Sequence, residues 1–390
     1  MSTFEQQSAT TEKGTDESLR FGFGRNWAEF IEQHFSEARV ESSRVHLLKV
    51  LRLEALNGRS FLDIGCGSGL HSLAALRAGA AKVVGFDYDA NSVATSLKVR
   101  EMAANDDARW SAEQGSVLDP ARMRALENFD IVYSWGVLHH TGALWEAMDN
   151  AIIPRKQDGV VYLALYSSDQ YVDPPAAHWV KVKRAYNKRN AVGKRMMEWK
   201  HASKLFVSSL RQGVMPWTVV RDYGVRGMDF WTDIKDWLGG WPIEFASYAE
   251  VDAWGRANGL TIVNASVGEG CTEYVLADPA HNAQWKAEDE RRAAITRPLA
   301  GPFTRGTGHT WVAQLPAHNG EGDDAHPPRG SNLMLFDRGR PFGLPHFMHV
   351  HVATFGAGRF AHWRDTVLFS TPDGSDPNTD PSRWSYCPEY

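Results

Sequence analysis

The chain has few cysteines and no long hydrophobic segment. Cys66, Cys271 and Cys387 are an odd number of widely spaced thiols in 390 residues, which argues against a disulfide framework and favours a reducing, cytoplasmic setting. No apolar run approaches the roughly 20 residues that span a bilayer. Met1–Arg20 is polar and lacks the apolar centre of a signal peptide. We therefore expect a cytoplasmic protein with no membrane partner and a disordered N-terminal tail.

A strong overall charge is also absent. The chain has 42 Lys and Arg against 47 Asp and Glu, a formal net charge of −5, which provides no general attraction to nucleic acids or anionic surfaces. The exception is the segment 179–213, where a single acid, Glu198, accompanies ten basic residues. These are Lys181, Lys183, Arg184, Lys188, Arg189, Lys194, Arg195, Lys200, Lys204 and Arg211. Such a run is typical of a solvated helix face, and contact with an acidic acceptor or an anionic partner is the alternative.

From residue 59 the sequence alternates between apolar strands and amphipathic helices. The pattern predicts five strands, at Arg59–Ile64, Lys82–Asp87, Trp110–Gln114, Phe129–Ser134 and Gly159–Tyr166. An amphipathic helix at 45–56 precedes them, and a helix at 247–258 with a β-hairpin at 260–276 closes the series. This alternation predicts an α/β fold with a doubly wound, Rossmann-like sheet covered by helices on both faces.

The remaining segments suggest a division of the chain into parts. We expect a tail and cap helix in 1–44, the sheet domain in 45–166 and 247–278, a helical insertion over the active site in 167–246, and a linker in 279–297. Residues 298–390 contain short strands, predicted at 310–315, 332–336, 349–355 and 366–369, between Gly, Pro, Asn and Asp. They predict a small all-β module, a sandwich or a partial barrel. His349 and His351 on one of these strands are a surface pair in the favoured interpretation, so we expect no metal site.

The first strand runs directly into a glycine loop, Gly65-Cys66-Gly67-Ser68-Gly69, which a helix follows. Glycines let a ligand lie against bare backbone, and the helix N-terminus offers N–H groups, so a nucleotide-type ligand is expected there. The G-x-G-x-G spacing differs from the G-x-G-x-x-G of dinucleotide sites and disfavours a dinucleotide. Asp87, at the end of the second strand, suits a ribose diol.

The fourth strand continues as Ser134-Trp135-Gly136-Val137-Leu138-His139-His140-Thr141. Taken with the glycine loop and Asp87, this segment resembles the class I S-adenosylmethionine-dependent methyltransferases, and it is most similar to small-molecule enzymes such as the ubiquinone-biosynthesis methyltransferases. The resemblance covers about residues 58–168. It implies S-adenosyl-L-methionine as the cofactor.

The resemblance also implies roles for individual residues, position by position. The residues that would bind the cofactor's methionine moiety are Asp63, Gly65, Cys66, Gly67 and Gly69. Asp87 would accept the ribose hydroxyls, with Tyr88 beside the adenine. Ser116 and Val117 would contact the adenine, and Ser134 and Trp135 would lie near the sulfonium end.

Methyl transfer requires alignment and a dry pocket, and a base only where the acceptor holds a proton. His139 or His140, just past the fourth strand, is placed for that role, and helix capping or packing is the alternative for each. Tyr166 completes the predicted catalytic set. The predicted substrate-binding residues are Trp27, Arg226, Trp231 and Trp241. A thioether acceptor would need no base and would favour such aromatic walls.

These observations predict a methyltransferase that acts on O, N or S of a small-molecule metabolite. The alternatives are a sugar or polysaccharide O-methyltransferase, S-methylation of an amino-acid-like thioether, and a non-catalytic cofactor-binding regulatory protein. The fourth strand ends in Ser134-Trp135-Gly136-Val137 and not in the Asp/Asn-Pro-Pro-aromatic motif of amino-methylating nucleic-acid enzymes. We therefore expect a small-molecule partner and no nucleic acid, and a homodimer stays open.

Overall fold

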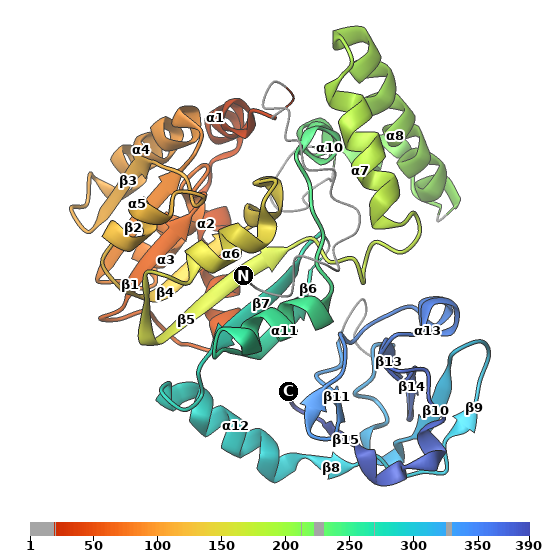
Figure 1. The fold of residues 1–390 in the computed structure, drawn as a ribbon. Helices are drawn as coiled ribbons and strands as arrows, with labels where there is room; N and C mark the ends of the chain where they lie inside the picture. The colour runs from red at the N-terminus through yellow and green to blue at the C-terminus, as the bar shows by residue number, and fades with distance from the viewer. Residues whose placement is uncertain (1–18, 20, 212, 222–229, 269, 325–329) are drawn as a thin grey trace. The chain divides into compact units, whose positions relative to one another are not determined.

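The computed structural model describes residues 19, 21–211, 213–221, 230–268, 270–324 and 330–390 (Figure 1). The chain divides into two compact units, Met1–Phe245 and Ala246–Tyr390. Nearly all of the tail that we predicted in residues 1–20, and the predicted substrate residue Arg226, lie outside the described residues. The division into parts that the sequence suggested stays a prediction.

A mostly parallel sheet positions the site. Its strand order is β3-β2-β1-β4-β5-β7-β6. The first five strands in the chain are β1 (Ser60–Ile64), β2 (Lys82–Asp87), β3 (Trp110–Gln114), β4 (Phe129–Trp135) and β5 (Arg155–Leu165), and their pairings are parallel. β6 (Thr261–Val267) and β7 (Thr272–Ala277) pair antiparallel. This topology confirms the predicted doubly wound, Rossmann-like fold.

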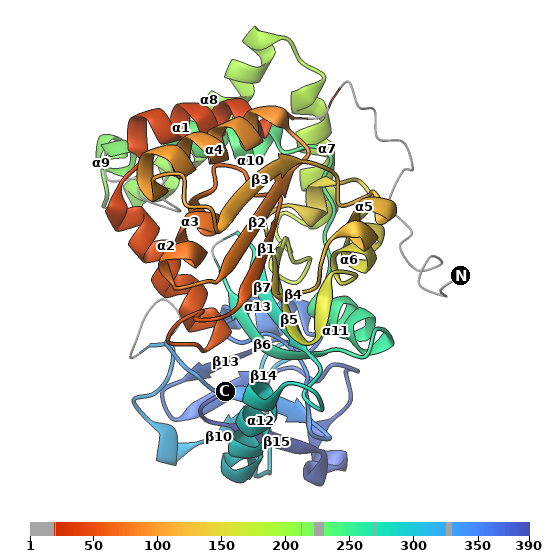
Figure 2. The same ribbon diagram turned by 90° about the vertical axis from the view of Figure 1, so that its left-hand side faces the viewer.

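Helices alternate with the strands of the first unit, as Figure 2 shows from the side. They are α1 (Phe23–His34), α2 (Glu37–Leu51), α3 (Leu70–Arg77), α4 (Ala90–Ala104), α5 (Pro120–Ala125) and α6 (Leu144–Ala151). The helix predicted at 45–56 begins at Glu37, because the Ser36 side chain accepts the Arg39 N–H as an N-cap. It ends where Arg52 adopts a left-handed conformation, with φ 53°.

The strand registers bring the functional loops to one edge of the sheet. Asp63 of β1 pairs with Gly85 of β2 on one side and with Tyr133 of β4 on the other. β1 and β4 are almost wholly buried, as expected for strands covered on both faces. The carboxyl ends of β1, β2 and β4 therefore meet, and the segments that follow them form the candidate site.

The insertion after β5 is helical, as predicted. It contains α7 (Ala176–Asn187), α8 (Ala191–Arg211), α9 (Pro216–Arg221) and α10 (Phe230–Gly239). These helices have an apolar cluster of their own, whose buried members are Tyr186, Ala202, Phe230, Ile234 and Leu238.

The second unit begins with α11 (Tyr248–Ala257), β6 and β7, continues through α12 (Ala283–Ile295), and ends in an all-β module. One antiparallel sheet has the order β13-β14-β10-β9 and the other β12-β11-β15-β8. The first consists of Phe360–Trp363, Thr366–Phe369, Trp311–Gln314 and Thr304–Arg305. The second consists of Arg340–Pro341, Met334–Asp337, Trp384–Cys387 and Arg297–Pro298.

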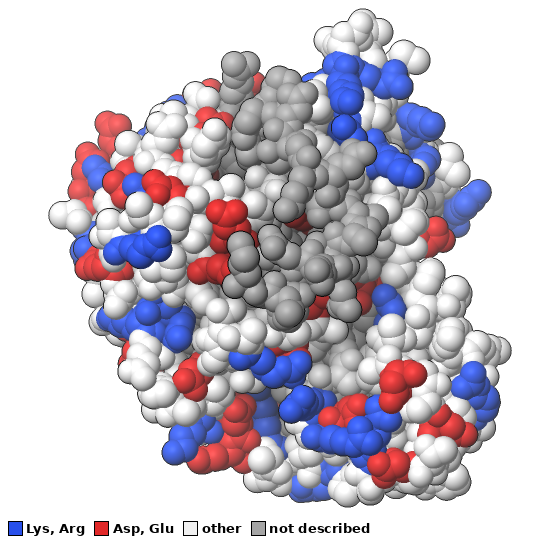
Figure 3. Space-filling model, in the orientation of Figure 1, with Lys and Arg blue, Asp and Glu red and all other residues white. Residues whose placement is uncertain are grey.

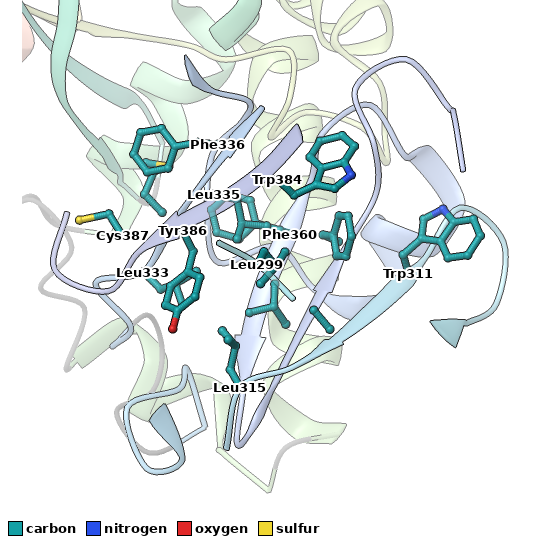
Figure 4. Close-up of a cluster of buried hydrophobic side chains, with 14 of the residues drawn as sticks. Leu299, Trp311, Leu315, Leu333, Leu335, Phe336, Phe360, Trp384, Tyr386 and Cys387 are labelled. Atoms are coloured by element: carbon teal, nitrogen blue, oxygen red, sulfur yellow. The ribbon is translucent and has the colours of Figure 1, made fainter. Parts of the chain in front are cut away.

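Both sheets contribute side chains to one apolar cluster (Figure 4). Phe360 and Trp311 enter it from one sheet, and Leu335 and Trp384 enter it from the other. A core shared between two small sheets is the sandwich arrangement, so the prediction of an all-β module is confirmed.

One predicted strand of this module is wrong. Residues His349–Phe355 form a helix, α13. The β-branched residues there suggested a strand, but only Val352 is buried, and the exposed Val350 has 60% of its surface accessible. Gly356, with φ +58°, ends the helix. Packing of α13 against β13 and β14 overrides the local preference, so the predicted strand-face pair of His349 and His351 does not exist.

Trp384 offers a test of this core, since it is among the largest fully buried side chains. Trp384→Ala should lower the free energy of unfolding of the module by about 3–5 kcal/mol, because it leaves a large cavity. Trp363, which is 38% exposed, provides the control. Trp363→Ala should change the module's free energy of unfolding by less than about 1 kcal/mol. Hydrogen exchange of the module's amides in increasing urea measures both. Equal losses in the two variants would contradict the assigned core.

Candidate active site

The glycine loop after β1 is held by backbone hydrogen bonds to the end of β2. The N–H groups of Gly65 and Cys66 donate to Phe86 O at 2.8 and 3.0 Å, and Gly67 N–H donates to Asp87 Oδ2 at 3.0 Å. Gly65 and Gly67 adopt φ +75° and +52°, the left-handed region that favours glycine. A Cβ on Gly65 would lie 2.4 Å from Val137 Cγ1. The loop and the segment after β4 are therefore in close contact.

Two buried carboxylates support this loop. Burial raises the pKa of Asp63 to about 7, although Ser72 Oγ donates to Asp63 Oδ2 at 2.6 Å. Burial also raises the pKa of Asp87, against the hydrogen bonds from Gly67 N–H and Asp89 N–H. Asp63 therefore binds Ser72 in the first turn of α3, which follows the loop. Asp87 binds the loop directly, through Gly67 N–H.

The end of β4 is joined to the end of β1. Ser134 Oγ donates to Ile64 O at 3.0 Å and is fully buried. The next residue, Trp135, has its ring centroid 5.8 Å from that of His71, which belongs to the first turn of α3. Ser134 and Trp135 thus lie beside the end of β1 and the start of α3, and their position near the sulfonium end stays a prediction.

The residues predicted to contact adenine lie at the end of β2 and in the turn after β3. Gly115 N–H donates to Asp87 O at 2.9 Å, which brings the turn after β3 against the end of β2. In that turn Ser116 Oγ accepts Leu118 N–H at 3.1 Å, and Val117 is buried. Tyr88 is 57% exposed. The structure therefore brings Asp87, Tyr88, Ser116 and Val117 together, and their contact with adenine stays a prediction.

His139 and His140 form a short 3-10 turn, Leu138–His140, after β4. The His139 ring is fully buried, and its centroid lies 4.1 Å from that of Tyr166 and 4.4 Å from that of His140. His140 Nδ1 lies 2.7 Å from Pro242 O. A carbonyl oxygen only accepts, so Nδ1 carries the proton, and in the neutral tautomer Nε2 holds the lone pair.

The N-terminal helix α1 contacts both halves of this arrangement. The Phe23 ring lies 5.2 Å from that of His140, and the indole Nε1 of Trp27 is the nearest atom to a Cβ built on Gly67, at 3.2 Å. Gly24 N–H donates to Asp89 Oδ2 at 3.0 Å. Phe23 and the predicted substrate residue Trp27 therefore lie at the histidines and the glycine loop.

The other predicted substrate residues differ in position. Phe21 N–H donates to Trp241 O, and the residue after Trp241 holds His140, so Trp241 belongs to the site. The indole N–H of Trp241 is buried and lacks a hydrogen-bond partner among the described residues. The Trp231 ring instead packs on Trp199, 4.8 Å away, within the insertion.

Two residues of the site were not predicted. The first is Glu244, two residues after Pro242. Its Oε2 accepts Leu144 N–H at 2.9 Å at the start of α6. The backbone N–H of Glu244 donates to His139 O. Burial raises the pKa of Glu244 to about 7. The second is Lys183, a fully buried lysine with its Nζ 4.0 Å from the Trp237 ring and 5.7 Å from that of Tyr166.

No signal in the sequence singles out Glu244 or Lys183, because both contacts join segments far apart along the chain.

Among the residues that the structure describes, no group of three or more His, Cys, Asp or Glu side chains could hold a metal ion. In the same residues, no helix is long and apolar enough to cross a membrane.

Part of the chain is similar in sequence to known proteins. Residues 33–204 match the family model described as "Methyltransferase domain", a range that contains the glycine loop, Asp87 and both histidines. A tRNA U34 carboxymethyltransferase of Klebsiella pneumoniae is 30% identical over 138 residues, which are 34% of this chain and 40% of the relative. The chain thus spans less than half of the length of the curated relatives that it matches.

Solved structures give weaker likenesses. A magnesium protoporphyrin IX methyltransferase from Synechocystis PCC 6803 with bound SAH is 12% identical with a TM-score of 0.38, over 65% of this chain and 91% of that one. An O-methyltransferase family protein from Burkholderia thailandensis is 14% identical with a TM-score of 0.40, over 62% and 57%. Both TM-scores are low, so we infer nothing about this chain from either structure.

The raised pKa of Glu244 predicts a pH dependence of stability. The native state binds the Glu244 proton more tightly than the unfolded chain, so this group lowers stability as the pH rises from about 4.5 to about 7. The variant Glu244→Gln keeps an acceptor for Leu144 N–H and removes this loss. Its free energy of unfolding relative to the parent should therefore rise by up to about 3 kcal/mol between pH 5 and pH 8.

Urea unfolding at several pH values measures this difference, and any contribution of Asp63 cancels because both proteins contain it. The exposed Glu101→Gln is the matched control. A variant-to-parent difference that is the same at pH 5 and pH 8 would disprove the assigned role of Glu244.

Proposed function

We propose that residues 33–204, which match a methyltransferase-domain family model, form a class I S-adenosylmethionine-dependent methyltransferase domain. We propose further that this protein methylates a heteroatom of a small-molecule metabolite. The observation that carries the proposal is the position of His140. Its Nδ1 proton is held by Pro242 O, so the lone pair of the neutral ring lies on Nε2, in a segment that directly follows the β4 edge of the cofactor site.

The residues around the glycine loop fit the cofactor. Asp87 accepts the N–H groups of Gly67 and Asp89 and a hydrogen bond from the Ser92 side chain. Its carboxylate, at the end of β2 beside the glycine loop, also suits the hydroxyls of a ribose. The bare backbone of Gly65–Gly69 admits close approach of the methionine moiety. S-adenosylmethionine, when bound, supplies a methyl group on a sulfonium, which needs no further activation.

The acceptor side is aromatic. His139, His140 and Tyr166 contact one another, and Phe23 contacts His140. The Tyr166 ring also contacts those of Tyr171, Trp237 and Phe245 at 5.5–5.9 Å. Such walls exclude water and orient a flat or apolar acceptor. The buried N–H of Trp241 offers one donor to a polar group of that acceptor.

In this arrangement His140 Nε2 takes the proton that a hydroxyl or amine acceptor gives up, and Nδ1–H···O=C fixes the ring's tautomer. Gly240 leaves room for the ring, since a Cβ there would lie 2.8 Å from His140 Cε1. We assign His139 and Tyr166 the role of packing against His140 from two sides.

A direct assay separates this proposal from its alternatives. The full chain is incubated with methyl-labelled S-adenosylmethionine and separate panels of phenols, hydroxylated and amino metabolites, thioethers, polysaccharides and tRNA. Label on a small hydroxyl or amine acceptor supports the proposal. Label found only on polysaccharide or only on tRNA would reject it, and the tRNA panel is included because a tRNA U34 carboxymethyltransferase is among the relatives.

Asp87→Asn tests the cofactor half. Losing a charge-assisted acceptor should weaken binding of S-adenosylmethionine roughly tenfold to a hundredfold, which corresponds to about 1.5–3 kcal/mol. Isothermal titration calorimetry measures it, with Asp107→Asn on the surface as the charge-matched control. Unchanged affinity in Asp87→Asn would remove the ribose assignment.

His140→Gln tests the acceptor half. With a hydroxyl or amine acceptor, kcat should fall about 100-fold or more while the affinity for S-adenosylmethionine stays the same, because only the proton acceptor is lost. His139→Gln is the comparison and should reduce kcat less. If both variants keep full activity, the acceptor needs no base, and a thioether becomes the better assignment.

A further inference from the structure

The helical insertion has an outer face of one charge. All ten basic residues of the segment 179–213 lie on α7, on α8 or between them, and all except the fully buried Lys183 reach the surface. In Figure 3 the Lys and Arg side chains gather over these two helices. Glu198 does not offset them at the surface. It is buried, accepts the Tyr186 hydroxyl at 2.7 Å and pairs with Arg195 at 3.3 Å.

Apolar side chains share this face. Along α8 the residues Val192, Met196, Trp199, Val207 and Leu210 are exposed, at spacings of three or four residues or their sums, which place them on one side of the helix. The buried residues of the helix, Glu198, Ala202 and Ser209, lie on a different side from this stripe, and the exposed Leu205 also lies away from it. Helix α8 has 21 residues and is therefore about 30 Å long.

Exposed apolar residues also follow the end of α8 in the sequence. Val214, Met215 and Trp217 are exposed, and Trp217 has 63% of its surface accessible. Exposed Lys200, Lys204 and Arg211 run alongside the stripe on α8. Single exposed apolar residues are ordinary, but eight of them within one segment, five of which share one side of α8, mark an interaction surface. We name these eight residues, with Lys200, Lys204 and Arg211, the arm surface.

The charge of the arm surface selects among the classes of partner. In a twofold dimer the same patch lies on both subunits, so a second copy would place lysines against lysines. Protein interfaces are depleted in Lys, and aliphatic side chains gain little from nucleic-acid phosphates, which attract charge alone. An anionic bilayer surface satisfies both components, because apolar side chains enter the acyl boundary while Lys and Arg reach the headgroups.

We propose that the arm surface binds the surface of anionic lipid bilayers, with α8 lying in the interfacial plane. This departs from the sequence-based expectation of no membrane partner, which rested on the net charge and on the lack of a spanning segment. The proposal is independent of the methyl acceptor. It adds a location at which the enzyme would meet an acceptor held at, or released from, a membrane.

Vesicle flotation of the full chain tests the proposal. We expect the protein to float with vesicles of equal parts phosphatidylglycerol and phosphatidylcholine, and to stay unbound with phosphatidylcholine alone. The triple variant Lys200→Gln, Lys204→Gln, Arg211→Gln should bind the anionic vesicles more than tenfold more weakly. The triple variant Met196→Gln, Leu210→Gln, Trp217→Gln should show a similar loss without any change of charge.

Matched controls carry the same substitutions elsewhere. Lys49, Arg124 and Lys286 are exposed basic residues outside the arm, and Val45, Met102 and Val350 are exposed apolar ones. Their triple Gln variants should bind as the parent does. Binding that ignores lipid charge, the absence of binding, or equal loss in arm and control variants would overturn the proposal. Self-association that only the arm variants lose would assign the surface to a second copy and overturn it as well.

Discussion

The site depends on hydrogen bonds that attach bare backbone after β1 to the end of β2. Gly65 and Cys66 share one acceptor, Phe86 O, and Gly67 uses the Asp87 carboxylate. Left-handed φ angles make this path accessible to glycine, and the close contact of Gly65 with Val137 extends the constraint to the segment after β4. This arrangement also places the carboxylates of Asp63 and Asp87 where burial raises both pKa values, which means that burial disfavours their ionised forms.

The second half of the site is organised by the short segment that ends the insertion. Within five residues, Gly240 makes room for the His140 ring, Pro242 O fixes its tautomer, and Glu244 bonds both His139 O and Leu144 N–H. This segment therefore connects the histidine turn, the start of α6 and the insertion.

The sequence predicted the sheet and the positions of the glycine loop and Asp87 at its strand ends, because glycine spacing and the ends of parallel strands are local signals that tertiary packing preserves. It did not predict Glu244, which acts on Leu144 a hundred residues away. It placed a strand at 349–355, where packing on neighbouring strands favours helix α13. The basic run was visible as charge, but the outward position of Met196 depends on which side of α8 packs against the rest of the protein.

The three thiols have a practical consequence. Cys66, Cys271 and Cys387 are all buried, and burial beside Asp63 and Asp87 raises the pKa of Cys66 well above its usual range. Because alkylation proceeds through the thiolate, the native chain should be nearly inert to iodoacetamide. The rate at which Cys66 is modified then reports transient opening of the glycine loop, with no introduced probe. Cys271 and Cys387 report separately on opening of the second unit.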